Sequence, residues 1–366
     1  MFMPDFISQH KFPCPACGAS AEWNAARRAL VCPACGTTSP MEVNQQGVIV
    51  KEHDLVTALR NLPGEARGWQ SERRSVRCSS CQAISVFAPE KVAQKCEFCG
   101  SPSLLPYDDI KPPIRPESVL PFAVPTTQVR NALRKWYSSR WFAPNLLKKS
   151  AMTDTLKGIY LPYWTFDAQT QAQWTADSGT HYYESESFQD ANGRTQTRQI
   201  QRTRWQSATG SLENFFDDEL EPATKGVHAG LLRQVEPFPT QALVPYDAIY
   251  LSGWTVEHYQ IDLITAAAQA RDSMDAKLRE LCGAAVPGDT YRNLQVQTQY
   301  SGETFKHILA PVWLITYDYH GKSYQVLANG VTGQLAGEHP LSWLKVAIAV
   351  VCVLVVLLVL LLISRQ

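Results

Sequence analysis

The sequence predicts an α+β protein with two small four-cysteine ribbons, a β-rich duplicated α+β body and one C-terminal apolar helix. Three observations lead to this fold class. Four Cys-x-x-Cys pairs stand near the start of the 366-residue chain, an aromatic Pro-x-Trp segment occurs twice further on, and a long apolar run lies near the end. The composition, 45% hydrophobic and 19% charged with a formal net charge of zero, is typical of a folded protein rather than a disordered one.

The eight N-terminal cysteines form one module that occurs twice. Each cysteine of the first set recurs 64 positions later, and fourteen residues separate the two pairs within each set. Two thiolates on one tight turn can face the same ion, and two such turns complete a tetrahedral four-sulfur shell. We therefore predict metal ribbons over residues 12–40 and 75–103. The ligands are Cys14, Cys17, Cys32 and Cys35 in the first ribbon, and Cys78, Cys81, Cys96 and Cys99 in the second.

The spacing favours two zinc ions, one in each ribbon. Iron stays open as the alternative, because a tetrahedral thiolate shell suits either metal. A residue in the left-handed region after each pair would let backbone N–H groups face the sulfurs. Gly18, Gly36 and Gly100 supply it, and Gln82 is the departure. Four disulfides would need an oxidising compartment, and no signal-peptide pattern is seen at Met1–Asp5.

The charge of the ribbon region bears on nucleic-acid binding, which is common among zinc ribbons. Residues 1–110 contain 11 Lys+Arg and 11 Asp+Glu. A phosphate-binding domain should instead carry a basic face. The cluster Arg73, Arg74 and Arg77 is a candidate patch, but a solvated edge is the favoured interpretation.

Two connecting regions flank the second ribbon. Residues 41–74 form a connector with a short helix near 54–59, and residues 104–125 form a Pro-rich linker. A helix is expected in the first half of 126–150, which is rich in basic and aromatic residues. The aromatic side chains there could lie on an anionic membrane or pack inward, and inward packing is favoured. They are Trp136, Tyr137, Trp141 and Phe142.

Residues 126–338 are predicted to form an α+β domain with two related β halves. The segment 158–167 resembles 307–318, and each is expected to be a strand whose proline marks an edge or a strand start. Further strands are predicted over 200–207 and 293–300, and a helix over 262–282. Asn329-Gly330 predicts a hairpin between strands at 325–327 and 331–332.

The sequence contains no motif that is typical of a catalytic site. Gly321-Lys322-Ser323 lacks the upstream glycine of a phosphate-binding loop, and neither HExxH nor GxSxG occurs. The acidic run Asp217–Glu221 is expected to be solvated, and Asp167 and Asp318 to serve strand geometry. We therefore predict that the protein is not an enzyme.

The run Val346–Ile363 has 18 residues without a charge. At about 1.5 Å per residue it would be about 27 Å long, close to the hydrocarbon thickness of a bilayer. With Leu341 and Leu344 it predicts a transmembrane helix over 341–363. Because thiolates prefer a reducing compartment, the expected topology is tail-anchored and single-pass, with the bulk of the chain in the cytosol.

Several segments carry a resemblance to a known family. The tandem ribbons, LPYWTFD, YLSGWTVEHY and the stretch APVWLITYDYHGKSYQVLANGVTGQLAGEHP resemble bacterial proteins described as TFIIB-type zinc-ribbon-containing. Such proteins are often labelled "primosomal protein N′ (replication factor Y), superfamily II helicase". The resemblance covers nearly the whole chain, and the last stretch is its specific part. The helicase label conflicts with the missing Walker motif.

The resemblance implies a membrane-attached adaptor, because relatives are often encoded beside flotillin-like and phage-shock-type membrane proteins. The expected function is a zinc-ribbon scaffold at the cytosolic face of the bacterial inner membrane, with the lipid bilayer and membrane-associated proteins as partners. The alternative is a membrane-tethered nucleic-acid-binding protein linked to replication or transcription. The sequence leaves the oligomeric state open.

Overall fold

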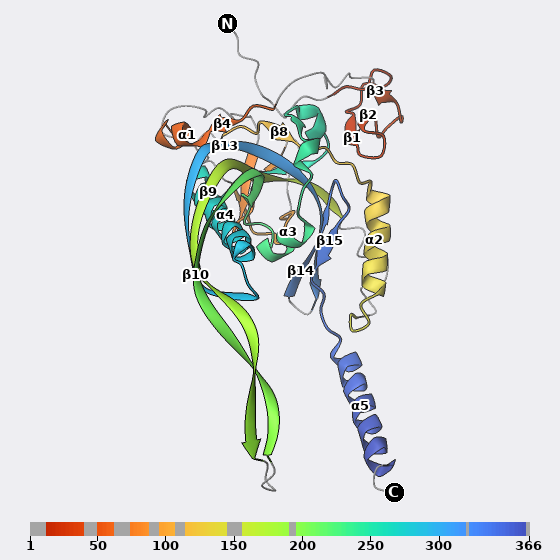
Figure 1. The fold of residues 1–366 in the computed structure, drawn as a ribbon. Coiled ribbons are helices and arrows are strands. Elements are labelled where there is room, and N and C mark those ends of the chain that lie inside the picture. Colours follow the sequence, from red (N-terminus) through yellow and green to blue (C-terminus); the bar gives the residue numbers. More distant parts are fainter. Residues whose placement is uncertain are drawn as a thin grey trace.

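The structure, a computed structural model, describes residues 12–39, 50–61, 74–87, 95–106, 114–144, 156–189, 195–319 and 322–363. Three long antiparallel strands form its spine (Figure 1). They are β9 (Lys157–Gln189), β10 (Thr195–Pro222) and β13 (Thr290–Tyr319). Strand β9 lies in the middle, between β10 and β13.

Burial along β9 follows the residue types. Every residue from Ile159 to Ala168 is buried, the next stretch alternates between exposed and buried, and beyond Thr180 almost every residue is exposed. A continuous apolar run is typical of a strand covered on both faces, and alternation is typical of a strand covered on one face. The predicted strands 200–207 and 293–300 are confirmed as parts of β10 and β13.

Short strands extend the sheet on both sides of the spine. Strand β13 pairs with β14 (Lys322–Asn329), β8 (Ser118–Val119) and β4 (His53–Asp54). Strand β14 continues to β15 (Leu335–Gly337), and β8 pairs with β11 (Val244–Pro245). On the other side, β12 (Thr255–Glu257) runs parallel to β9.

The helices pack around this sheet (Figure 1). Helix α4 (Leu263–Ala285) confirms the prediction for 262–282, and the Asp262 carboxylate accepts a hydrogen bond from the Thr265 N–H as its N-terminal cap. Helix α2 (Thr126–Ser138) confirms the helix expected in the first half of 126–150. Two shorter helices are α1 (Leu55–Asn61) and α3 (Ala229–Val235), and short 3₁₀ turns are η3 (Thr240–Ala242) and η4 (Ala248–Leu251).

The two similar segments, 158–167 and 307–318, lie side by side as antiparallel neighbours in β9 and β13. Their prolines are neither at a sheet edge nor at a strand start, so that prediction is wrong. On β9, the pairing with β12 ends at Tyr160 and the pairing with β10 begins at Tyr163, and Pro162 lies between these two points. Pro311 occupies the matching place between β8 and β14. A missing N–H is tolerated where one neighbouring strand ends and the next begins.

The hairpin predicted at Asn329-Gly330 is present, but its turn is longer than expected. The Asn329 side-chain oxygen accepts hydrogen bonds from the N–H groups of Val331 and Thr332, so these residues are part of the turn and not of a strand. The returning strand is β15.

The aromatic residues of 126–150 divide between the core and the surface. Tyr137 is buried and Trp136 packs against the same core cluster, as the inward interpretation expects. Trp141 is 74% exposed, so the stretch also presents an aromatic side chain to solvent.

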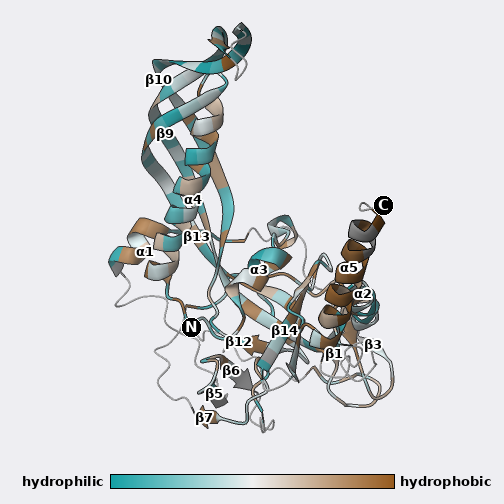
Figure 2. Cartoon of the chain, turned by 90° about the horizontal axis from the view of Figure 1, so that it is seen from below, coloured by the Kyte–Doolittle hydropathy of each residue, from teal (hydrophilic) through white to brown (hydrophobic). Residues whose placement is uncertain are grey.

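The C-terminal helix α5 (Trp343–Ile363) is apolar along most of its length (Figure 2). Most of its described side chains are exposed. Within the described residues, however, no helix is both long and apolar enough to cross a membrane.

This finding corrects two predictions. The transmembrane helix predicted over 341–363 is wrong, and the predicted fold class is wrong in that part. The predicted single-pass location in the inner membrane is contradicted for the same reason. The observed architecture is a strand-rich fold that carries two four-cysteine clusters.

Candidate metal centres

All four cysteine pairs adopt the same tight turn. In each turn the N–H of the residue after the second cysteine donates to the carbonyl of the first cysteine, at 2.9 Å. That residue has a φ of +74° at Gly18, Gly36 and Gly100. Gln82 has a φ of +65°, so the one non-glycine residue keeps the left-handed conformation. The amide of Phe98 lies 3.4 Å from the Cys96 sulfur, which is one N–H···S contact of the predicted kind.

The turns bring the predicted ligands together in two clusters. The four sulfurs of each set lie within 4.8 Å of one another. The sulfurs are 3.5 Å apart in Cys14–Cys35 and Cys17–Cys32, and 3.6 Å apart in Cys78–Cys99 and Cys81–Cys96. A disulfide bond would require about 2.0 Å, whereas a tetrahedral shell with metal–sulfur bonds of about 2.3 Å has sulfurs about 3.8 Å apart. The clusters therefore fit a metal ion.

Crowding the thiols shifts their pKa values apart. In the second cluster, the hydrogen bond with Cys81 lowers the pKa of Cys96 to about 5, and the same contact raises the pKa of Cys81 far above its usual range. In the first cluster, the Thr37 hydroxyl, 3.1 Å from the sulfur, lowers the pKa of Cys35 to about 6. One sulfur of each cluster, at Cys35 and at Cys96, therefore loses its proton more readily than an ordinary cysteine, and thiolate is the form that ligates a metal.

The first ribbon is a separate three-stranded sheet that docks on the body. Its strands are β1 (Glu22–Asn24), β2 (Ala29–Val31) and β3 (Thr38–Ser39). Trp23 is its anchor, because its indole N–H donates to the Phe122 carbonyl at 3.2 Å and its ring meets Tyr250 edge-on at 4.8 Å. The Ser252 hydroxyl adds a hydrogen bond to the Ala21 carbonyl, at 2.8 Å.

The second ribbon is continuous with the main sheet. It contains β5 (Arg74–Cys78), β6 (Ile84–Phe87) and β7 (Leu104–Pro106), and β6 pairs with β12 of the body. Phe98, between two ligands, is fully buried in a core cluster with Leu120 and Ile308. Its carbonyl accepts hydrogen bonds from the Thr316 hydroxyl and the Gln325 amide. This metal site is therefore part of the body's core.

Chelation is expected to remove the metal of the first ribbon before that of the second. Cys17 and Cys35 are exposed, whereas Cys81 and Cys99 are only partly exposed, and a chelator must reach the sulfur shell. Metal release to an excess of a colorimetric chelator should show two phases of one equivalent each.

Cys14→Ser serves to assign the phases. This variant should lose the fast phase and keep the slow one. Equal release rates in the unmodified protein, or loss of the slow phase in Cys14→Ser, would contradict the expected order.

A third group of carboxylates gathers around one buried lysine. Asp167, Asp217 and Asp218 bring one oxygen each within 4.8 Å of the others. The Lys306 ammonium lies 2.7 Å from Asp218 and 3.0 Å from Glu52, and its side chain is 6% exposed. An ammonium group among carboxylates supplies the positive charge that a metal would otherwise bring.

Backbone geometry holds this group in place. Asp218 has a φ of +54° at an irregularity in β10 between Phe216 and Glu219. Its N–H donates to one Asp167 oxygen at 2.6 Å, and the Thr304 hydroxyl donates to the other at 2.7 Å. Burial still raises the pKa of Asp167. The prediction that the run 217–221 is solvated is wrong, because Asp218 is half-buried and Glu221 is buried.

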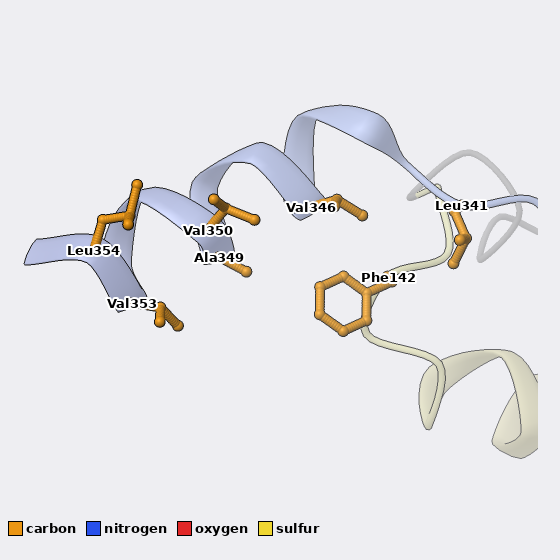
Figure 3. Close-up of a pocket in the computed structure, with 7 residues that line it drawn as sticks. All are labelled: Phe142, Leu341, Val346, Ala349, Val350, Val353 and Leu354. Atoms are coloured by element: carbon orange, nitrogen blue, oxygen red, sulfur yellow. The ribbon is translucent and has the colours of Figure 1, made fainter. Parts of the chain in front are cut away.

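An apolar groove lies between α5 and the loop after α2 (Figure 3). Its volume is about 440 Å³, and its lining is entirely aliphatic and aromatic. The lining residues are Phe142, Leu341, Val346, Ala349, Val350, Val353 and Leu354. The groove can exclude water, but none of these side chains could act as an acid, base or nucleophile.

The basic patch suggested by the sequence is only partly described. Arg77 is exposed and next to the ligand Cys78 in β5, whereas the side chains of Arg73 and Arg74 lie outside the described part of the chain. Sequence reasoning missed Lys306 and Glu52, although a lysine in an apolar strand segment is a signal that could have been noticed.

The fold and the sites define a strand-rich protein with two four-cysteine clusters that fit a metal ion, one docked on the main sheet and the other continuous with it. The chain is similar to "Uncharacterized protein YdjG" of Bacillus subtilis (strain 168), with 24% identity over 242 residues. The match spans 64% of this chain and 66% of that protein. No family model matches the chain, and no solved structure matches it.

Proposed function

We propose that this protein is a non-enzymatic adaptor whose two ribbons are structural zinc sites and whose first ribbon presents a protein-binding surface. Four thiolates close each coordination shell, and closed shells are typical of structural zinc, whereas catalytic zinc keeps an open position. The absence of disulfides among the described cysteines leaves their thiols available to a metal. A four-sulfur shell suits zinc or iron, and iron is distinguished by its visible absorbance.

The observation that carries the proposal is the outer surface of the first ribbon. Both of its metal-binding turns have the sequence Cys-Pro-Ala-Cys-Gly, and Pro15, Ala16, Pro33 and Ala34 are all exposed. Apart from the ligand cysteines, the two turns contain no ionisable side chain. Exposed small apolar residues on a rigid turn suit contact with another protein's apolar side chains.

Electrostatics disfavour a nucleic acid at this surface. Four thiolates and a divalent ion carry a formal charge of about −2, which repels phosphate. The nearby Arg27 guanidinium is directed at the ribbon itself, 3.0 Å from the Thr38 hydroxyl and 3.4 Å from the Gly36 carbonyl. The partner we propose is therefore a protein with an apolar contact patch. A flotillin-like or phage-shock-type partner stays a prediction.

The test compares two charge substitutions in the full-length protein. Ala16→Glu with Ala34→Glu places two carboxylates on the exposed turns, and Ala268→Glu on α4 is the control because Ala268 is also exposed. Both variants should retain two metal equivalents. We expect the control to co-purify with the same stoichiometric protein partner as the unmodified chain, and the ribbon variant to lose that partner.

Two results would overturn the proposal. One is retention of the partner by the ribbon variant. The other is co-purification of nucleic acid that dissociates steeply with salt, which would favour the nucleic-acid alternative.

A further inference from the structure

Strands β9 and β10 continue well beyond the rest of the sheet as a two-stranded ribbon (Figure 1). The last β9 residue paired with β13 is Gly179, and from there on, within the part of the chain that the structure describes, β9 pairs only with β10. We call residues 180–189 and 195–204 the arm. Ten residues per strand give it a length of about 33 Å.

Gly179 marks the root of the arm, where the three strands crowd together. A Cβ at this position would lie 2.7 Å from a Thr203 methyl, 2.8 Å from a Thr290 methyl and 2.8 Å from the Trp205 ring. Glycine allows β13 to end against the β9–β10 pair without forcing the strands apart.

The arm has no hydrophobic core of its own. None of its residues is buried, although its register is regular from Thr195↔Gln189 to Arg204↔Thr180. An isolated two-stranded hairpin is marginally stable in water, and its unpaired edges are templates for another strand. The arm contains neither proline nor lysine, residues that commonly protect an edge.

The two faces of the arm differ. One face carries both glutamates and all three arginines of the arm. Arg198 pairs with Glu186 at 2.7 Å and Arg202 with Glu184 at 2.6 Å, while Arg204 lies over the Tyr182 ring at 5.5 Å. The other face has no Asp, Glu, Lys or Arg side chain. It consists of His181, Tyr183, Ser185, Ser187, Gln189, Thr195, Thr197, Gln199, Gln201 and Thr203.

The charges also divide by strand. Within the arm, β9 carries Glu184 and Glu186 and no cation, whereas β10 carries Arg198, Arg202 and Arg204 and no anion. One free edge is therefore acidic and the other is basic. Pairing β9 with β9 of another copy would oppose glutamates, and pairing β10 with β10 would oppose arginines, which is unfavourable.

We propose that the arm is a self-assembly element: the free β10 edge of one copy pairs with the free β9 edge of a second copy. If β10 of one copy pairs with β9 of the next in the antiparallel register that the two strands use within one chain, acidic and basic strands alternate across the extended sheet. The occupant is a second copy because each edge already has its complement on the same chain. Since β13 covers β9 up to Gly179, the contact is confined to the arm.

The proposed interface joins two different edges, so it is heterologous and repeats from copy to copy. Such contacts generate closed rings or open filaments. All arms would point in one direction, because each added β9 runs antiparallel to the β10 that it joins. Helix α5 extends to the same side of the body as the arm (Figure 1), so every α5 would leave the assembly on one side.

The test uses two charge-reversed variants of the full-length protein. Variant A is Glu184→Arg with Glu186→Arg, and variant B is Arg198→Glu with Arg202→Glu. We expect sedimentation or mass photometry to show association of the unmodified chain at concentrations up to about 100 µM. Each variant alone should associate about tenfold more weakly or worse, because its two edges then carry like charges.

Mixing the variants separates edge pairing from loss of arm structure. Both variants lose the ion pairs within the arm, yet the β10 edge of A is basic and the β9 edge of B is acidic. An equimolar mixture should therefore regain association, and high salt should weaken it. The control is Asp272→Arg with Glu280→Arg, which reverses two exposed charges on α4 and should associate like the unmodified chain.

Three outcomes would overturn the proposal. They are an unmodified chain that stays monomeric over the whole concentration range, variants that associate as well as the unmodified chain, and a mixture that associates no better than its components. Rings of one size and filaments of many sizes would both support it.

Discussion

Replacing Cys78 and Cys96 with serine is expected to remove one metal equivalent and to destabilise the whole body of the protein. Both residues are buried, and Cys96 lies two positions from the fully buried Phe98. A structural zinc shell contributes about 10–16 kcal/mol to the folding of small ribbons. We expect the free energy of unfolding to fall by about 5 kcal/mol or more, because the second ribbon shares strand pairing and core with the body.

The matched control is Cys14→Ser with Cys32→Ser, which removes the corresponding buried ligands of the first ribbon. It should also lose one metal equivalent, but the body should unfold at nearly its original denaturant midpoint. Metal content by mass spectrometry and urea unfolding followed by circular dichroism are the measurements. Equal destabilisation by the two pairs, or retention of both metals, would contradict the assignment of the second ribbon to the core.

Lys306→Met is expected to cost about 3–5 kcal/mol of stability, since removing one partner of a buried ion pair leaves unpaired buried charge. The Lys306 side chain is 6% exposed and meets Asp218 and Glu52. Methionine preserves much of the side-chain volume, so the loss reports the charge rather than a cavity. Urea unfolding at neutral pH measures the effect.

Lys277→Met is the control. Lys277 also pairs with a carboxylate, Glu219, but its side chain is 54% exposed. Exposed ion pairs contribute about 0–1 kcal/mol, so this variant should unfold near the unmodified midpoint. An equal loss of folding stability in Lys306→Met and Lys277→Met would contradict a buried charge network at Lys306.

The pH dependence adds a second check on the same network. Burial holds the pKa of Asp167 above its usual range, so this carboxyl takes up a proton more readily in the folded state than in the unfolded chain. Without the Lys306 ammonium, protonation of these carboxylates removes the unpaired charge. The loss of folding stability in Lys306→Met should therefore be largest at a pH above the raised pKa of Asp167. It should shrink as the pH falls through that pKa.

The ribbons were predictable because their geometry is local. Two cysteines with two residues between them specify their own turn. The structure places Gln82 in the same left-handed conformation as the glycines. Helix α4 was predictable for the same reason, since its cap and apolar stripe are contiguous.

The structural features that could not be predicted from the sequence depend on contacts between segments that are far apart in the chain. The union of the second ribbon with the body depends on the β6–β12 register and on the burial of Phe98. The Lys306 network joins Glu52 to a residue 254 positions later. Neither periodicity nor spacing reports such contacts, and the prolines of β9 and β13 were misplaced because the ends of their neighbouring strands were unknown.

The docking of the first ribbon has a consequence for the order of events during synthesis. Its cysteines are complete by residue 35, but the hydroxyl that binds Ala21 belongs to Ser252, which is 231 residues after Ala21. At a typical elongation rate of about 5–20 residues per second, that interval lasts about 10–50 s. The ribbon can load its ion and fold long before its docking surface has left the ribosome. A metal bound there would therefore keep the first-made module folded while the rest of the chain is still being translated.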